Sequence, residues 1–96
     1  MSDDPKLQIL HDAAHSRFTT VVDAMTARLD YRLDGRTLSI NHTEVPEPLQ
    51  GRGIAGALVA EAVRHARANA LVVVPNCSYA RSWMERHPQS RDVLAR

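Results

Sequence analysis

The stretch that decides the fold runs from Thr37 to Pro75: TLSINHTEVPEPLQGRGIAGALVAEAVRHARANALVVVP. Its first part, 37–45, alternates apolar and polar residues, which is typical of a strand with one buried face. The apolar residues then recur every three to four positions, which predicts a helix over 53–68. The run at 70–75 is short, continuous and apolar, and it ends at a proline, so we expect a buried strand there.

This strand–helix–strand unit determines which edge of the sheet can bind a ligand. Two strands joined by a helix lie parallel, and the connection between them is right-handed. The residues 42–45, the start of the helix at 51–54 and the residues 75–77 are therefore expected at one edge. Ligands of open α/β sheets bind at this edge.

The residues before this unit predict two antiparallel hairpins. Strand patterns at 17–22 and 25–33 flank a turn at Asp23-Ala24, and Asp34-Gly35 is a strong signal for a second two-residue turn. The second turn pairs Leu33 with Arg36. This register predicts one shared face made of Met25, Ala27, Leu29 and Tyr31 opposite Glu44, His42, Ile40 and Leu38.

The two ends of the chain complete the predicted domain. Residues 1–14 are polar, contain an early proline and show no sustained period, so we expect a flexible arm before a domain at 15–96. An amphipathic helix is expected from Ser78 to about Arg86, ending before Pro88. The fold class is therefore a mixed α/β domain: three antiparallel strands, a βαβ crossover and a C-terminal helix.

Composition excludes several classes of function. A chain of 96 residues has room for one modest core, and its net charge of +1 comes from interspersed charges, so we expect no nucleic acid partner. The single cysteine and the scattered histidines predict neither a disulfide nor a metal site. No segment resembles a leader or a membrane span, so we expect a cytoplasmic protein without membrane contact, as a monomer or weak dimer.

The loop Gln50–Ala55, with the sequence QGRGIA, has the parts that bind a phosphate. The first N–H groups of a helix lack internal partners and carry a partial positive charge. Gly51 and Gly53 allow the backbone to approach a ligand closely, and Arg52 adds a full charge. The same glycines could serve only to turn the chain into the helix, so the pattern by itself leaves both interpretations open.

The residues 51–56 also fit G-x-G-x-x-G, the dinucleotide fingerprint, but their context does not. The fingerprint follows directly from a parallel strand, whereas Pro46 and Pro48 intervene here. An acidic residue should end the next strand, and the sequence there is Val-Pro-Asn-Cys at 74–77. A kinase-type phosphate loop is excluded because no Gly-Lys-Ser/Thr follows.

The same segments resemble the GNAT superfamily of N-acetyltransferases, in particular a small single-domain subfamily with a truncated N-terminal half. Gln50–Ala55 matches the Q/R-x-x-G-x-G/A signature between a strand and a helix, and the resemblance covers about 17–94. The other matching segments are HTEVP at 42–46, VVPNCSY at 73–79, Trp83 and His87-Pro88. The resemblance implies an enzyme that transfers acetyl from acetyl-coenzyme A to a primary amine of a small molecule or a protein side chain.

The resemblance also implies how the coenzyme is bound. The pantetheine arm is expected along Val45 and Pro46, in the gap between the last two strands, with Asn76 as a further contact. The pyrophosphate is expected on the loop residues Gln50, Gly51, Arg52, Gly53, Ile54 and Ala55. The two helices that shape the amine pocket of larger relatives have no counterpart here, so we expect an open acceptor site.

Four residues are candidates for the chemistry. Cys77, at the start of a helix, is a possible acetyl-accepting nucleophile or a neighbour of the thioester, or it is only a small buried side chain. His42 and Glu44 are predicted to interrupt the apolar face near the ligand edge, where a general base belongs, or they are only hydrogen-bonded. The resemblance implies that Tyr79 protonates the leaving thiolate; its alternative is packing beside Trp83.

A second function remains open from the sequence. The missing amine pocket is also compatible with a coenzyme A-binding module that has little or no catalysis and acts as a sensor or partner-binding protein. A nucleic-acid binder is poorly supported, because basic residues do not line one face with aromatic residues between them.

Overall fold

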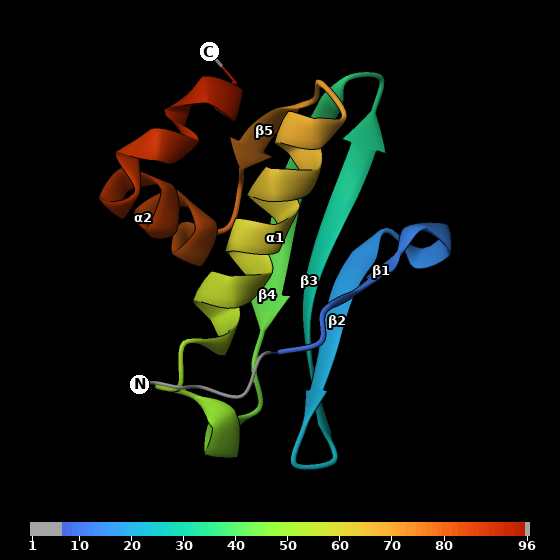
Figure 1. Cartoon of the computed structure of the whole chain (residues 1–96), viewed down its shortest axis with the longest axis vertical. Helices are drawn as coiled ribbons and strands as arrows, with labels where there is room; N and C mark the ends of the chain where they lie inside the picture. Colours follow the sequence, from blue (N-terminus) through green and yellow to red (C-terminus); the bar gives the residue numbers. More distant parts are fainter. Residues whose placement is uncertain (1–6, 96) are drawn as a thin grey trace.

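The computed structural model describes residues 7–95, which form a five-stranded mixed sheet with two α-helices (Figure 1). The strands lie in the order β1-β2-β3-β4-β5; neighbours are antiparallel from β1 to β4, and β4 and β5 are parallel. The elements are β1 (Leu10–Asp12), the 3-10 helix η1 (Ala13–His15), β2 (Arg17–Val22), β3 (Met25–Asp34), β4 (Thr37–Glu44), the 3-10 helix η2 (Glu47–Leu49), α1 (Ile54–Ala68), β5 (Val72–Pro75), α2 (Ser78–Arg86) and the 3-10 helix η3 (Pro88–Val93). The predicted mixed α/β fold is confirmed.

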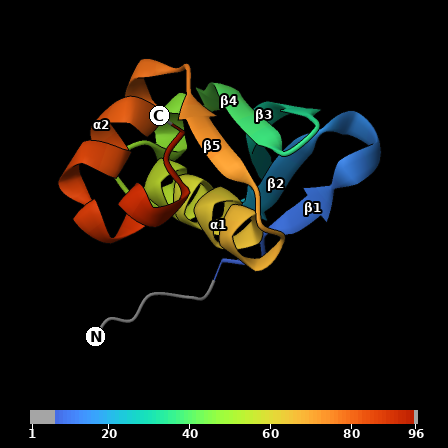
Figure 2. The same ribbon diagram turned by 90° about the horizontal axis from the view of Figure 1, so that it is seen from above.

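Helix α1 lies across one face of the sheet, with α2 beside it (Figures 1 and 2). The predicted apolar stripe of α1 is buried because it faces the strands; it consists of Ile54, Leu58, Val59, Ala62, Val63 and Ala66. The helix ends where the backbone N–H of Asn69 donates to the carbonyls of His65 and Ala66. The predicted βαβ crossover is confirmed, and it places the start of α1 beside the end of β4.

The expectation of a loose arm over 1–14 does not hold for its last part. Residues 1–6 lie outside the described residues, but Leu10–Asp12 pairs with β2. The ring of His11 stacks on that of Phe18, with centroids 4.3 Å apart, and its Nε2 lies 2.6 Å from the hydroxyl of Tyr31. A three-residue strand is too short to show an alternating pattern, which explains why the sequence did not predict it.

The first predicted turn is confirmed. Val22 pairs with Met25, so Asp23-Ala24 is a two-residue hairpin turn. Both turn residues have left-handed φ values, 51° and 64°. This matches the type I′ turn, whose twist fits the right-handed twist of the flanking strands.

The predicted register of the second hairpin is wrong by two residues. Tyr31 lies opposite Ile40, and the two-residue turn is Gly35-Arg36 rather than Asp34-Gly35. Only Gly35 takes a left-handed φ, 61°, at the first turn position. Glycine is favoured at that position in one of the two common hairpin turns, so the Asp-Gly dipeptide was compatible with either placement.

A β-bulge then interrupts the pairing of β3 with β4 at Asn41, which has no partner in β3. Beyond the bulge Thr43 lies opposite Leu29 on the core face of the sheet. His42 and Glu44 consequently lie on the opposite, exposed face. The predicted position of these two residues on the apolar face is therefore wrong, because one extra residue in a strand reverses its alternation.

Candidate functional site

The strands β4 and β5 separate next to the start of α1. Their pairing ends at Ile40 and Pro75, where the backbone N–H groups of Asn76 and Cys77 both donate to the carbonyl of Ile40, at 2.9 and 3.1 Å. Strand β4 continues to Glu44 without a partner in β5. The two strand ends and the helix start therefore meet at one edge, as the sequence predicted.

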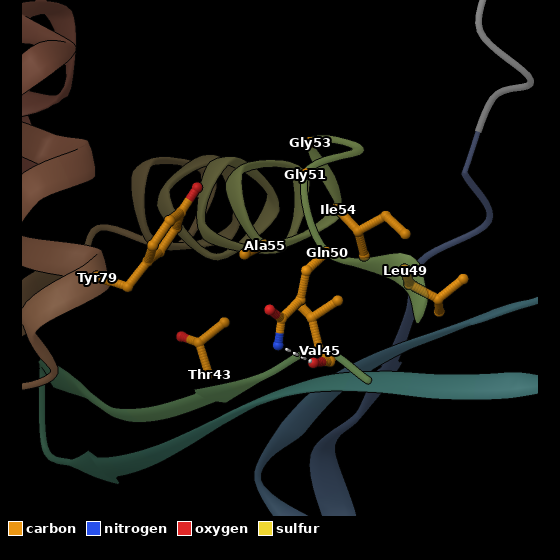
Figure 3. Close-up of a pocket in the computed structure, with 9 residues that line it drawn as sticks. All are labelled: Thr43, Val45, Leu49, Gln50, Gly51, Gly53, Ile54, Ala55 and Tyr79. Atoms are coloured by element: carbon orange, nitrogen blue, oxygen red, sulfur yellow. Dashed lines mark hydrogen bonds between the residues drawn. The ribbon is translucent and has the colours of Figure 1, made fainter. Parts of the chain in front are cut away.

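A pocket of about 400 Å³ lies at this edge (Figure 3). Such a volume is within the range of small-molecule and cofactor sites. Its walls come from the end of β4, from the loop before α1, from the first residues of α1 and from the start of α2. The lining residues are Thr43, Val45, Leu49, Gln50, Gly51, Gly53, Ile54, Ala55 and Tyr79.

The loop that enters α1 leaves the helix N-terminus open toward the pocket. Gly51 and Gly53 both have left-handed φ values, 82° and 80°, a conformation that favours glycine. Gly53 is the N-cap of α1 and no side chain caps the helix there, so its first N–H groups remain available to a ligand. The amide of Gln50 donates to the carbonyl of Val45 at 3.0 Å and ties the loop to the end of β4.

Three residues expected to contact a coenzyme do not line the pocket. Pro46 forms the N-cap of η2. The guanidinium of Arg52 forms an ion pair with Asp23, 3.1 Å from its Oδ2. The amide of Asn76 donates to Oδ1 of Asn41 at 2.9 Å.

Cys77 is partly buried and is not one of the residues that line the pocket. It is the N-cap of α2, and its Sγ accepts a hydrogen bond from the backbone N–H of Ala80 at 3.3 Å. Its Sγ also lies 3.5 Å from Oγ1 of Thr43, a residue of the pocket. The structure therefore connects Cys77 with the pocket through Thr43.

The side chains of His42 and Glu44 do not point toward Thr43 and Cys77. His42 Nε2 lies 3.4 Å from Oε1 of Glu44, and the same oxygen lies 3.0 Å from Arg28 Nη2. The pKa of Arg28 is raised, chiefly by its hydrogen bond to Asp30. These side chains form a polar network on the exposed face of the sheet, on the other side of β4 from Thr43.

Tyr79 lies at the same end of the pocket as Thr43, away from Leu49 (Figure 3). Its hydroxyl and the indole of Trp83 both approach Gly56 of α1, each 3.2 Å from where a Cβ would stand. Both interpretations of Tyr79 thus have a structural basis: it packs beside Trp83 against α1, and it also lines the pocket.

Sequence reasoning missed two lining residues, Thr43 and Leu49. The inward position of Thr43 depends on the bulge at Asn41, which no local pattern marks. Leu49 could have been found, because it is an isolated apolar residue in a polar, proline-containing loop, and such a residue often anchors a loop. It is fully buried and holds the loop on the core.

Two further observations concern the described part of the chain. Between residues 7 and 95 no helix has the length and apolar composition needed to cross a bilayer. Within the same residues no three His, Cys, Asp or Glu side chains are grouped so that they could hold a metal ion.

Comparison with known proteins identifies the family to which this mixed sheet and its pocket belong. Residues 17–93 match the family of GCN5-related N-acetyl-transferases. The chain is also similar to a GCN5-like candidate N-acetyltransferase from Staphylococcus aureus, known from an NMR solution structure. The identity is 31%, the match covers 93% of this chain and 88% of the other, and the TM-score is 0.74. The chain therefore belongs to the GCN5-related N-acetyltransferase family.

Proposed function

We propose that this protein transfers acetyl from acetyl-coenzyme A to a primary amine of a small molecule or of a protein side chain. The observation that carries the proposal is the pocket that joins the uncapped N-terminus of α1 to the gap between β4 and β5. A helix N-terminus binds phosphate through its free N–H groups and its partial positive charge. A long thioester cofactor with a pyrophosphate at one end suits this combination.

The residues present fit such a coenzyme. Gly51 and Gly53 carry no side chain that would keep a pyrophosphate from the first turn of α1. Val45 would lie along the pantetheine arm, and the end of β4 beyond Ile40 has no β5 partner in the described structure, so its backbone groups are available to the amides of that arm. We place the thioester end near Thr43, where the gap closes on Cys77.

When bound, the coenzyme supplies an activated acetyl group, and the chain supplies orientation and proton transfer. Tyr79 lines the pocket and would give its hydroxyl proton to the leaving sulfur. His42, backed by Glu44, would accept the proton of the attacking amine only if the amine arrives from the exposed face of the sheet. In this proposal the proton donor and the proton acceptor lie on opposite faces of the sheet.

One observation favours a second function. Because His42 and Glu44 face away from the pocket, the chain could bind the coenzyme without efficient transfer. It would then act as a coenzyme A-binding sensor or partner-binding module.

The deciding experiment offers acetyl-coenzyme A with a labelled acetyl group and a panel of small amines and lysine peptides. Transfer of label to an acceptor above the background of a Gly53→Val variant supports the enzyme. Binding by calorimetry without transfer supports the module. Desulfo-coenzyme A should bind and NAD should not; tight binding of NAD with no binding of the coenzyme would contradict both functions.

A further inference from the structure

Arg52 is the one charged side chain of the loop Gln50–Ala55, yet it does not line the pocket. Its guanidinium instead lies 3.1 Å from a carboxylate oxygen of Asp23, in the turn between β2 and β3. Figure 1 shows this turn at the same end of the sheet as the start of α1. The cation that a phosphate at the helix terminus would attract is therefore already paired with an anion of the protein.

The carboxylate of Asp23 is carried by a short hairpin turn with a defined backbone conformation. The turn has only two residues between the paired Val22 and Met25, and both turn residues have left-handed φ values. Aspartate tolerates this conformation better than most residues, so it suits the turn as well as the ion pair. Arg52, by contrast, lies between two glycines and has a long side chain, so we expect its guanidinium to be the more mobile partner of the ion pair.

The ion pair is weak enough to exchange. The side chains are 48% and 65% exposed, so solvent screens their attraction, and such surface pairs contribute at most about 1 kcal/mol. A phosphate group carries more charge than a carboxylate and would also bind the free N–H groups of α1. It would therefore displace Asp23 rather than be excluded by it.

We propose that Asp23 competes with a phosphate group of the coenzyme for Arg52, so that the β2–β3 turn lowers the affinity of the pocket. This inference rests on the proposed function. In the free protein Arg52 is paired with Asp23; in the complex it turns to the phosphate and leaves Asp23 in solvent. The turn thus belongs to the binding site although it contributes no wall to the pocket.

The test is a double-mutant cycle measured by calorimetry with coenzyme A at low and high salt. Asp23→Asn should tighten binding about two- to fivefold, the range expected when an exposed ion pair is removed from the free state. Asparagine accepts the left-handed turn conformation, so the fold is retained. Arg52→Gln should weaken binding, and Asp23→Asn should have no further effect in that variant. High salt should reduce the gain in coenzyme A affinity that Asp23→Asn produces.

Asp34→Asn is the matched control, because it removes one negative charge at the hairpin on the opposite end of the sheet (Figure 1). Weaker binding by Asp23→Asn would mean that Asp23 positions Arg52 for the ligand and would overturn the inference. A gain equal to that of Asp34→Asn would overturn it too. Failure of the unaltered protein to bind the coenzyme would instead refute the proposed function, and the inference with it.

Dephospho-coenzyme A, which lacks the 3′-phosphate, identifies the phosphate group that displaces Asp23. If Asp23→Asn still tightens the binding of this ligand, the displacing group is the pyrophosphate. If the gain in affinity is lost, the displacing group is the 3′-phosphate.

Discussion

The hydroxyl oxygen of Thr43 lies 3.5 Å from the sulfur of Cys77 and joins the end of β4 to the start of α2. The contact exists because the bulge at Asn41 turns Thr43 toward the core face. The same sulfur accepts a hydrogen bond from the backbone N–H of Ala80. Cys77 is thus held between a residue of the pocket and the first turn of α2, and its role can be tested separately from coenzyme binding.

The first prediction concerns the glycine at the start of α1. Gly53→Val should weaken coenzyme A binding by more than tenfold, about 1.4 kcal/mol or more, because the side chain would obstruct the approach of the pyrophosphate. Gly35→Val is the matched control: both glycines have left-handed φ values, and neither has an atom within 4 Å of an added Cβ. Both variants should lose stability through backbone strain, about 1–3 kcal/mol, measured by urea unfolding. If calorimetry gives equal affinities for the two variants, the loop is only a structural turn.

The second prediction concerns the contact between the two helices at Gly56. A Cβ there would stand 3.2 Å from the hydroxyl of Tyr79 and from the indole nitrogen of Trp83. Gly56→Ala gains helix propensity, about 1 kcal/mol, but forces both side chains to move, so its free energy of unfolding should stay within about 1 kcal/mol of the original. Gly56→Leu should lose about 1–3 kcal/mol through overpacking. In a Tyr79→Phe background, which removes one of the two close contacts, Gly56→Ala should be more favourable than in the original protein. Unchanged stability of Gly56→Leu would mean that α1 and α2 are not tightly packed here.

The third prediction concerns acid stability. The pKa of His65 is lowered, first by burial and then by the nearby His11 and Arg64, while Glu61 opposes the shift. The ring of His65 lies against those of His11 and Phe18, with centroids 4.4 and 5.7 Å away, so a charge on His65 would stand among aromatic rings between α1 and the first two strands. The folded state disfavours protonation of His65. The contribution of His65 to folding stability is therefore complete above its ordinary pKa of about 6.5 and declines as the pH falls below that value.

Urea midpoints at pH 7.5 and pH 5 measure this effect. The midpoint should fall with pH in the unaltered protein and fall less in His65→Phe, which keeps an aromatic ring beside His11 and Phe18 but cannot titrate. Equal decreases in the two proteins would place the titrating group elsewhere.

The parts of the fold that the sequence predicted are those set by long local patterns. The apolar stripe of α1 repeats over fifteen residues, so the helix and the crossover that contains it could be placed within one or two residues. The turn at Asp23-Ala24 and the pocket loop followed from strand patterns and a specific motif. The strand Leu10–Asp12 was missed because three residues are too few for an alternating pattern, and because the contacts of His11 with Phe18 and Tyr31 join residues far apart in the sequence.

The parts that failed depend on the placement of one turn and on one extra residue in a strand. The Asp-Gly dipeptide at 34–35 is compatible with two turn placements, and the choice depends on how the whole hairpin packs. The bulge at Asn41 then reversed the faces of His42 and Thr43. A sequence pattern can identify the edge where the site lies, but the inward-facing residues at that edge are determined by the bulge.

The last prediction separates two mechanisms at Cys77. If this residue is a nucleophile, incubation with acetyl-coenzyme A and no amine should leave a thioester on it, and Cys77→Ala should abolish transfer. If the amine attacks the coenzyme directly, Cys77→Ala should retain substantial transfer and His42→Ala should be the more damaging change. We expect direct attack, because it needs no second acyl transfer and because the sulfur already caps α2.

Cys77→Ser makes the test sharper than alanine alone, because the hydroxyl keeps a cap for Ala80 and a polar contact for Thr43. For direct attack, Cys77→Ser should therefore match the unaltered protein in stability and nearly in rate, whereas Cys77→Ala should lose about 0.5–2 kcal/mol of stability with the cap. Intact-protein mass spectrometry, with and without hydroxylamine, detects any acetyl adduct, and urea unfolding separates the loss of the cap from the loss of chemistry. A hydroxylamine-sensitive adduct that passes into product, together with an inactive but stable Cys77→Ser, would show that acetyl passes through the sulfur in two steps.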